Sequence, residues 1–226
     1  MGSEIFIIIP VYNEAAVIAQ TLHEVMKTGH KIIVVDDGSS DGTGAIVKTF
    51  PVYYLRHHVN IGQGAALQTG MDFAKRHDAA AVVHFDADGQ HRASDIGKLL
   101  KLVLEDGYDV VFGSRFLQHQ PVNMPFTRRI FLKLARYVNW LFTGILLTDA
   151  HNGLRALSYQ AIYLIRFSEN RMAHASEILS QIRDYELRYC EVPVTIDYTA
   201  YSRNKGQSLW NSINIIFDLL FKKINR

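Results

Sequence analysis

Ile5-Phe6-Ile7-Ile8-Ile9-Pro10 is an unbroken apolar run that closes on a proline. Such a run predicts a strand buried on both faces of a parallel sheet, because a half-exposed strand would alternate apolar and polar residues. Short strands are also predicted at residues 31–35, 52–55, 79–85 and 109–113, with helices between them at 14–27, 41–48, 64–76 and 94–105. This alternation predicts an α/β fold with a Rossmann-like, mostly parallel sheet and helices on both of its faces.

Polar or glycine-containing clusters follow each of the five predicted strands. They are Tyr12-Asn13-Glu14, Asp36-Asp37-Gly38-Ser39, Asn60-Ile61-Gly62, Asp86-Ala87-Asp88 and Gly113-Ser114-Arg115. The carboxyl ends of parallel strands meet at one edge of the sheet, and ligands bind in the crevice there. We therefore expect the functional site at this edge.

The stretch Asp86-Ala87-Asp88-Gly89-Gln90-His91 places two carboxylates one residue apart at the end of a buried strand. Buried charges are tolerated when they are paired or when they coordinate a metal. Carboxylate and amide oxygens suit Mg²⁺ and Mn²⁺. The alternative is a simple exit from strand to turn, where Asp and Gly are common. The convergence of the five strand ends favours a divalent cation that meets a phosphorylated substrate.

The composition limits the class of protein. The chain has 226 residues, of which 48% are hydrophobic and 20% are charged, as in an ordinary globular protein. The net charge of +2 gives no electrostatic reason to expect a nucleic-acid partner. Cys190 is the single cysteine, which excludes an internal disulfide and fits a reducing compartment. No apolar run reaches the roughly 18–20 residues that span a bilayer.

The second half of the chain has a different pattern. Residues 126–147 are basic and aromatic with apolar residues at helical spacing, which predicts an amphipathic helix. Further helices are predicted at 160–165, 176–185 and 209–221, with a late strand at 189–198. The segments 126–147 and 209–221 are typical of helices that lie in a membrane interface. The alternative is that both cover the sheet, with their apolar sides facing the core.

Several polar residues are expected to be structural. Asp36 is predicted to bond the turn that follows it, and Asp41 to cap the next helix. The segment Asp149-x-x-Asn152-Gly153-x-Arg155 is predicted to form a turn in which Arg155 packs or pairs locally. Four histidines lack the spacing of metal ligands and are expected to be hydrogen-bonded in the core or the crevice, His91 next to the metal ligands: His57, His58, His84 and His91.

Four motifs occur in order along the chain: Ile9-Pro10-Val11-Tyr12-Asn13-Glu14, Val35-Asp36-Asp37-Gly38-Ser39-Ser40-Asp41-Gly42-Thr43, Asn60-Ile61-Gly62-Gln63-Gly64-Ala65-Ala66 and Asp86-Ala87-Asp88-Gly89-Gln90-His91. Together they closely resemble glycosyltransferase family 2, and within it the polyprenyl-phosphate sugar transferases such as the dolichol-phosphate mannose synthases. The resemblance implies a GT-A fold. No repeat or linker divides the chain, so one catalytic domain is expected over residues 1–226. Its nucleotide-sugar half would be 1–115 and its acceptor half, with the amphipathic helices, 116–226.

The resemblance also implies roles for particular residues. Tyr12 would pack on the base, Asp37 would read the base edge, and Asp86 would lie between the ribose and the metal. The full set of implied substrate-binding residues is Pro10, Tyr12, Glu14, Asp37, Gly62, Asp86, Ala87 and Ser208. The implied ligands of Mg²⁺ or Mn²⁺ are Asp86, Asp88 and Gln90.

The implied catalytic residues are Asp88, Arg115, Arg203 and Glu177. Arg115 and Arg203 would neutralise phosphate charge, for which a guanidinium is well shaped. Glu177 stands where family members with hydroxyl acceptors carry a base, whereas a phosphate acceptor is already ionised and needs none. The chain departs from the usual pattern at Gln63, where many relatives carry a lysine, and also at Gln207 and Leu209.

The expected reaction is an inverting, metal-dependent transfer of a hexose or N-acetylhexosamine. The donor is a UDP-sugar or GDP-mannose, and the acceptor is a polyprenyl phosphate at the membrane surface. We expect a cytoplasmic protein bound peripherally to the inner face of the membrane, an arrangement that leaves room for a separate membrane-protein partner. One alternative is a family 2 transferase to a sugar hydroxyl with Glu177 as the base. Others are a nucleotidyltransferase and a non-catalytic subunit that binds a nucleotide sugar.

Overall fold

The computed structural model describes residues 4–117, 136–137, 140–141, 143–150, 152–168 and 174–197. The described strands are β1 (Ile5–Val11), β2 (Lys31–Asp36), β3 (Tyr53–Arg56), β4 (Ala81–His84), β5 (Val110–Ser114), β6 (Arg155–Ser158) and β7 (Tyr189–Pro193). The described helices are α1 (Ile18–Met26), α2 (Thr43–Val47), α3 (Gln63–Arg76), α4 (Ile96–Leu104), α6 (Tyr159–Leu164) and α7 (His174–Asp184), and a 3₁₀ turn, η1 (Ala93–Asp95), precedes α4. Arg203, Ser208, the predicted helix 209–221 and most of the predicted helix 126–147 lie outside the described residues.

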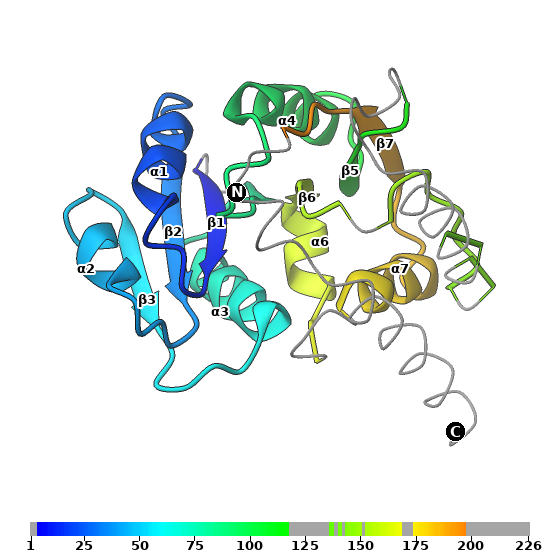
Figure 1. Ribbon diagram of the computed structural model, residues 1–226. Helices are drawn as coiled ribbons and strands as arrows, with labels where there is room; N and C mark the ends of the chain where they lie inside the picture. Colours follow the sequence, from blue (N-terminus) through cyan, green and yellow to red (C-terminus); the bar gives the residue numbers. More distant parts are fainter. Residues whose placement is uncertain are drawn as a thin grey trace.

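The seven described strands form one sheet in the order β3-β2-β1-β4-β6-β5-β7. β1, β2, β3 and β4 are parallel, and β5 is parallel to β7. β6 is antiparallel to both of its neighbours, β4 and β5. The prediction of a mostly parallel sheet is therefore confirmed, and strands from both halves of the chain share that sheet (Figure 1).

The segment that contains Arg155 is a correction to the sequence analysis. It was predicted to be a turn with Arg155 in a local role, but Arg155 begins β6, which lies between β4 and β5. A strand of four residues, Arg-Ala-Leu-Ser, is too short to show a clear periodicity. It is stabilised by pairing on both sides, which local sequence does not reveal.

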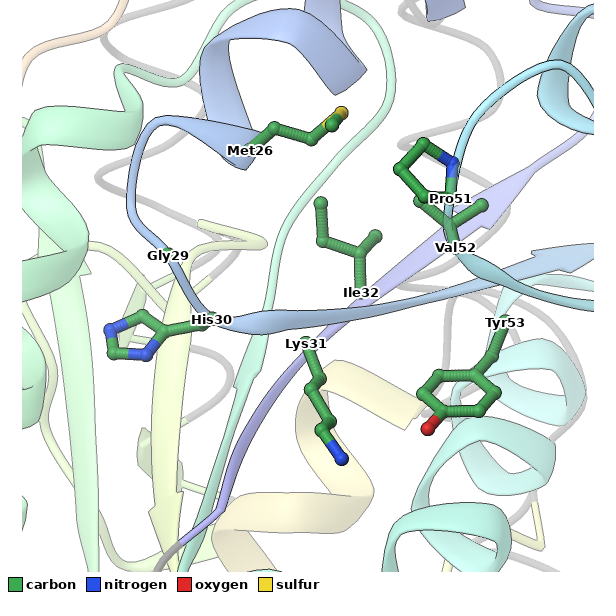
Figure 2. Close-up of a pocket in the computed structure, with 8 residues that line it drawn as sticks. All are labelled: Met26, Gly29, His30, Lys31, Ile32, Pro51, Val52 and Tyr53. Carbon is green, nitrogen blue, oxygen red and sulfur yellow. The ribbon is translucent and has the colours of Figure 1, made fainter.

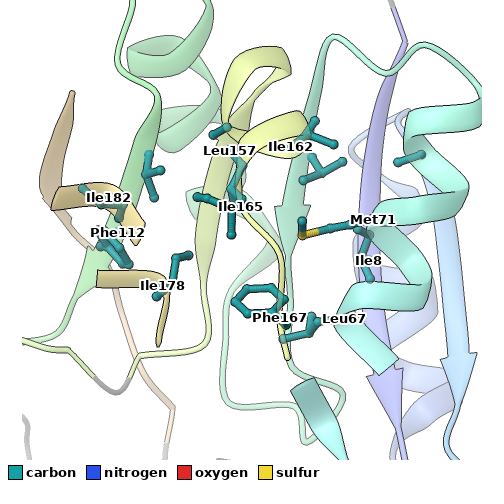
Figure 3. Close-up of a cluster of buried hydrophobic side chains, with 14 of the residues drawn as sticks. Ile8, Leu67, Met71, Phe112, Leu157, Ile162, Ile165, Phe167, Ile178 and Ile182 are labelled. Carbon is teal, nitrogen blue, oxygen red and sulfur yellow. The ribbon is translucent and has the colours of Figure 1, made fainter. Parts of the chain in front are cut away.

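Helices cover both faces of the sheet. Alternate β1 residues point to opposite faces, so Phe6 and Ile8 belong to one buried cluster and Ile7 and Ile9 to another. The first cluster includes side chains from α3, α6 and α7, and Figure 3 shows part of it. The second includes side chains from α1, α2 and α4. These four residues of β1, Phe6 to Ile9, have 0% exposure, as the unbroken apolar run predicts.

The structure shifts several predicted helix boundaries. α1 begins at Ile18 rather than at residue 14, and α4 begins at Ile96 rather than at residue 94, because η1 precedes it. The residue before α2 is Gly42, but the Asp41 carboxylate accepts the N–H of Thr43 at 3.0 Å. The prediction of Asp41 as the N-cap is therefore wrong by one residue: the N-cap is Gly42, and Asp41 accepts the N–H of the first helical residue from the position before it.

Close packing between α3 and β1 predicts a specific effect on stability. A Cβ at Gly70 would lie 2.4 Å from Cγ2 of Ile8, whereas a Cβ at Gly97 in α4 would meet nothing within 4 Å. We expect Gly70→Ala to lower the free energy of unfolding by about 2 kcal/mol through overpacking. Gly97→Ala is the matched control and should raise it by up to about 1 kcal/mol through helix propensity. Urea unfolding measures both, and equal effects of the two substitutions would contradict this packing.

Candidate functional site

The loops after β1 and β2 are tied together at the carboxyl edge of the sheet. The Asn13 N–H donates to Oγ of Ser39 at 3.0 Å, and the Glu14 N–H donates to Oγ1 of Thr43 at 2.9 Å. Tyr12, in the same loop, has 45% of its surface exposed. Pro10 lies partly buried near the end of β1. The loop therefore presents an exposed aromatic ring from a backbone held in place by neighbouring side chains.

Asp36 has the structural role predicted for it. One carboxylate oxygen accepts the Ser39 N–H at 2.7 Å, and the other accepts the Tyr54 hydroxyl at 2.6 Å. Burial, followed by the hydrogen bond and charge of Asp36, raises the pKa of Tyr54 to about 12. Asp36 is 1% exposed, so these contacts satisfy a buried carboxylate within the protein.

Asp37 holds the loop that precedes α3. Its carboxylate accepts the N–H groups of Ile61 at 3.0 Å and Gly62 at 2.7 Å. His57 Nδ1 lies 2.7 Å from Asp37 Oδ1, and His57 Nε2 lies 2.9 Å from Oγ1 of Thr69. Asp37 and Gly62 are therefore adjacent, as a shared site requires, and reading of a base edge by Asp37 stays a prediction.

Asp86 lies in a polar surrounding built from separate parts of the chain. Its Oδ1 accepts the amide Nε2 of Gln63 at 2.9 Å, and its Oδ2 lies 3.1 Å from Nε2 of His91. Burial raises the pKa of Asp86, but the hydrogen bond from His91 and the positive charges of His91 and Arg155 outweigh burial and lower it overall. The Gln63 contact was not foreseen from the sequence, because the two residues come from different strand ends.

Asp88 has a different electrostatic environment. Its carboxylate accepts the backbone N–H of Gln90 at 3.0 Å and the side-chain amide of Gln90 at 2.9 Å. Burial, and then the negative charge of Asp86, raises the pKa of Asp88 to about 6. Glu14 also raises it. The carboxylates thus repel one another at this strand end, which favours a bound cation.

The donor set fits a metal that shares its coordination with a substrate. Among the residues that the structure describes, no group of three or more His, Cys, Asp or Glu could hold a metal ion alone. Mg²⁺ is usually bound by one or two carboxylates together with substrate phosphates. That pattern is matched by the side chains that follow β4, which are Asp86, Asp88 and Gln90. The predicted metal role of these three residues stays a prediction.

Ala87 lies between the two aspartates, and its backbone is hydrogen-bonded to helix α1. It is 4% exposed, and its carbonyl accepts the Thr21 hydroxyl of α1 at 3.0 Å. The side chain of Ala87 belongs to the buried cluster under α1 and α4. Helix α1 therefore anchors the backbone on which Asp86 and Asp88 are placed.

The chain after β7 returns to this strand end. The Asp197 N–H donates to the Gln90 carbonyl at 2.9 Å, and His91 forms an isolated antiparallel bridge with Ile196. Arg92 donates to both Asp197 carboxylate oxygens, at 2.6 and 2.8 Å. Asp197 is the last described residue before Arg203. The late strand predicted for residues 189–198 ends at Pro193, and these contacts replace its final part.

Arg115 follows β5 and is paired inside the protein. Its Nε lies 2.6 Å from Oδ2 of Asp149, and the side chains are 11% and 1% exposed respectively. Glu191 of β7 supports this pair, because its carboxylate accepts N–H groups of Thr148 at 2.8 Å and Asp149 at 3.1 Å. Glu191 gave no signal in the sequence, since only the β5–β7 pairing brings it to this loop. A phosphate contact from Arg115 stays a prediction.

Glu177 lies in the first turn of α7, and its carboxylate accepts the N–H of Ser168 at 3.0 Å. The turn predicted at Asp149 and Asn152 is present, because the backbone N–H of Asn152 donates to the Asp149 carbonyl at 3.2 Å.

The predictions for the four histidines had mixed outcomes. His57 and His91 are hydrogen-bonded, as predicted. His84 is buried with no partner for either ring nitrogen, and His58 is exposed, so the prediction is wrong for these two.

A groove on the opposite edge of the sheet is separate from this site. It lies where β2 and β3 begin, beyond the end of α1 (Figure 2). Its lining residues are Met26, Gly29, His30, Lys31, Ile32, Pro51, Val52 and Tyr53. Parallel α/β sheets bind ligands at the carboxyl ends of their strands, so the groove lies at the wrong end for the predicted chemistry.

Comparisons with known proteins show similarity over nearly the whole chain. The model of glycosyl transferase family 2 matches residues 6–165. An uncharacterized protein of Methanocaldococcus jannaschii is 38% identical over 225 residues, covering 98% of this chain and 93% of that protein. The UDP-N-acetylglucosamine–dolichyl-phosphate N-acetylglucosaminyltransferase of Methanococcus voltae is 31% identical over 243 residues, covering 98% of this chain and 97% of that protein.

A solved structure shows the same fold. It is a glucosyl-3-phosphoglycerate synthase of Mycobacterium tuberculosis in complex with Mn²⁺, uridine diphosphate and glucosyl-3-phosphoglycerate. Its TM-score is 0.75 at 16% sequence identity, covering 97% of this chain and 78% of that one. The predicted GT-A fold is therefore confirmed.

The raised pKa of Asp88 predicts how stability depends on pH without metal. The folded state holds the carboxyl proton of Asp88 with a pKa of about 6, whereas the ordinary pKa of an aspartate is 3.8. The stability contributed by this proton is complete below pH 3.8 and is lost as the pH rises through about 6. We therefore expect Asp88→Asn to be more stable than the wild type at about pH 7 and to lose this advantage at about pH 4.

Urea unfolding with a chelator present measures this difference, with Asp106→Asn, an exposed carboxyl near the end of α4, as the control. A difference between Asp88→Asn and the wild type that does not grow with pH would contradict the raised pKa of Asp88 in the folded protein.

The buried pair between Arg115 and Asp149 predicts a large cost for removing one partner. Asp149→Ala leaves a charge and several donors without their acceptor, and we expect it to lower the free energy of unfolding by about 3 kcal/mol. Asp184→Ala removes one partner of an exposed pair with Arg183, whose side chains are 51% and 56% exposed. That control should change stability by less than about 0.5 kcal/mol. Similar costs in the two unfolding curves would argue against a supporting role for Asp149.

Proposed function

This chain belongs to glycosyl transferase family 2, and from that premise we propose that it transfers a sugar from a nucleotide sugar to a polyprenyl phosphate. The donor is a UDP-sugar or GDP-mannose, and the sugar is a hexose or N-acetylhexosamine. One named relative is an N-acetylglucosaminyltransferase to dolichyl phosphate. Another is a polyprenol monophosphomannose synthase of Mycolicibacterium smegmatis, 33% identical over 220 residues, covering 92% of this chain and 82% of that protein.

The observation that carries the proposal is the pair of carboxylates at the end of β4. Burial, and then the negative charge of Asp86, raises the pKa of Asp88 to about 6, and a cation at this strand end would offset the charge that both effects disfavour. Asp86, Asp88 and Gln90 would hold Mg²⁺ or Mn²⁺. The bound metal would offset the charge that develops on the departing nucleotide diphosphate.

The other residues at this edge bind and orient the donor. The exposed Tyr12 ring offers a flat apolar surface for a base, and its loop is held by Ser39 and Thr43. Asp37 and Gly62 form the neighbouring wall. The acceptor oxygen attacks the anomeric carbon from the face opposite the nucleotide, which inverts the configuration there.

Two arginines neutralise the phosphate charges in this proposal. Arg115 is held in a fixed orientation by Asp149. Arg203, with Ser208 nearby in the sequence, would contact the acceptor phosphate, and both lie outside the described residues. A phosphate acceptor needs no general base. Glu177 would therefore orient groups around the acceptor, whereas in the alternative reaction with a sugar hydroxyl it would be the base.

Exposed apolar side chains support contact with a membrane surface. Tyr137, Trp140 and Leu141 follow helical spacing and are 56%, 47% and 70% exposed. In the alternative, the apolar side of the predicted helix faces the core. Aromatic and aliphatic side chains beside basic residues suit the boundary between headgroups and acyl chains.

In the part of the chain that the structure describes, no helix is both long and apolar enough to cross a membrane. We propose that the protein binds peripherally at the cytoplasmic face of the membrane. A separate membrane-protein partner stays a prediction.

An acceptor assay tests the proposed reaction. The wild type should transfer sugar from a UDP-sugar or GDP-mannose to a short polyprenyl phosphate only when Mg²⁺ or Mn²⁺ is present. Asp88→Ala should lower kcat/KM by at least about a hundredfold, because the metal would lose a charged ligand. Transfer to soluble glycans but not to the lipid phosphate would favour the hydroxyl-acceptor alternative. Nucleotide-sugar binding without turnover of either acceptor would favour a non-catalytic subunit.

Liposome flotation tests the membrane proposal. A variant with Tyr137, Trp140 and Leu141 all changed to serine should bind vesicles with anionic lipid at least about tenfold more weakly, because it loses apolar burial in the interface. Its turnover of a water-soluble, short-chain acceptor should be unchanged. The control changes Leu104 and Tyr185, which are 50% and 49% exposed on other elements, to serine. Equal flotation of the two variants would contradict the proposed membrane surface.

A further inference from the structure

β6 runs beside the strand that carries the two aspartates, and its register determines what lies next to Asp86. His84 pairs with Arg155 in the antiparallel ladder between β4 and β6. In an antiparallel pair, two residues forward from His84 correspond to two residues back from Arg155, so Asp86 lies opposite Gly153. Side chains two residues apart on a strand share a face. Asp86, His84, Gly153 and Arg155 therefore lie on one face of the sheet.

Gly153 leaves the space that the Asp86 carboxylate occupies. A Cβ at position 153 would lie 2.0 Å from Oδ2 of Asp86 and 2.6 Å from Oδ1. Gly153 is absent from the glycines with positive φ in the described chain, so its backbone does not itself require glycine. The constraint is space, since any side chain here would push the carboxylate away from its contacts with Gln63 and His91.

Arg155 is a buried cation behind the same carboxylate. It is 2% exposed, and its Nε has no hydrogen-bond partner. Its guanidinium lies 5.9 Å from the ring centroid of Phe167. Burial lowers the pKa of Arg155 to about 10, and the negative charge of Asp86 opposes that effect.

The other residues near Arg155 do not neutralise its charge. The rings of His84 and His174 also contact Phe167, at centroid distances of 5.8 and 5.6 Å. Burial, followed by the charges of Arg155 and His174, lowers the pKa of His84 well below its usual value. Asp86 is thus the negative charge that compensates Arg155 among the described residues.

A buried charge of this kind is not explained by stability. Replacing a whole buried ion pair with apolar residues of similar volume is often neutral or stabilising, so stability alone does not require the charges of Arg155 and Asp86. Leu157 shares the face of β6 with Arg155 and is apolar and fully buried, so an apolar residue would fit beside it. The arginine therefore points to a requirement of the neighbouring site.

We propose that Arg155 is a positioning residue for Asp86, acting with the space left by Gly153. Its charge draws the carboxylate back over Gly153, where Gln63 and His91 complete its contacts. Asp86 is then kept apart from Asp88, with the side chain of Asp88 turned to Gln90. This inference rests on the proposed function, because it assigns Arg155 to the same metal and nucleotide site.

The experiment measures Mn²⁺ binding by electron paramagnetic resonance with UDP or GDP present, whichever nucleotide the wild type binds. Arg155→Met should weaken Mn²⁺ binding by about tenfold or more, as substitutions behind metal ligands do. Its melting temperature should fall only modestly, because the Asp86 carboxylate keeps its contacts with Gln63 and His91. Arg155→Lys keeps the charge and should restore most of the affinity. Arg76→Met, an exposed arginine at the end of α3, is the control and should bind as the wild type does.

A second variant tests the proposal without altering any charge. Gly153→Ala should weaken Mn²⁺ binding in the same way, whereas Gly97→Ala, with open space around its added methyl group, should not. This pair decides the question if Arg155→Met fails to fold. Wild-type Mn²⁺ affinity in a folded Arg155→Met or in Gly153→Ala would overturn the inference and leave the proposed function standing. A wild type that binds no Mn²⁺ with either nucleotide would overturn the metal-dependent function as well.

Discussion

The antiparallel pairing of β6 with β4 is the constraint on which the site depends. It inserts a strand from the second half of the chain between β4 and β5, which the first half supplies. It sets Gly153 against the Asp86 carboxylate and places Arg155 in the buried layer behind it. The β5–β7 pairing on the other side brings Glu191 to the loop that holds Asp149 and, through it, Arg115. Each polar group at the carboxyl edge is thus supported from a neighbouring strand.

The electrostatics of the edge divide the acidic residues by role. The carboxylate oxygens of Asp36 and Asp37 accept hydrogen bonds from protein donors and fix the shapes of two loops. Asp86 is surrounded by donors and positive charge, which lower its pKa. Asp88 receives less compensation and has a pKa of about 6. Charge at Asp88 is therefore unfavourable in the folded protein, and a bound cation would relieve it.

Much of the fold could be predicted from local pattern. The β1 run is apolar at every position, and a strand of that kind has few alternatives to the centre of a parallel sheet. β6 could not be predicted, because four residues carry too little periodicity and its stability comes from two partners distant in sequence. The motif Asp86 to His91 was visible because strand, carboxylates and amide are contiguous. Gln63 and Glu191 were not, since each reaches its partner only through packing. His84 was expected to be hydrogen-bonded and has no partner, because burial depends on neighbours that a linear pattern does not specify.

The sequence by itself determined the α/β class, the carboxyl edge as the location of the site and the motifs that resemble glycosyltransferase family 2, because these depend on short-range order along the chain. The tertiary structure decided which charges meet. Arg155 reads in sequence as part of a local turn, yet the strand register places it behind Asp86. Gly153 reads as a turn glycine, yet it leaves the space that the carboxylate of Asp86, in a different motif, occupies. The physical reason is that electrostatic and steric effects depend on distance in space, which only strand pairing and close packing define.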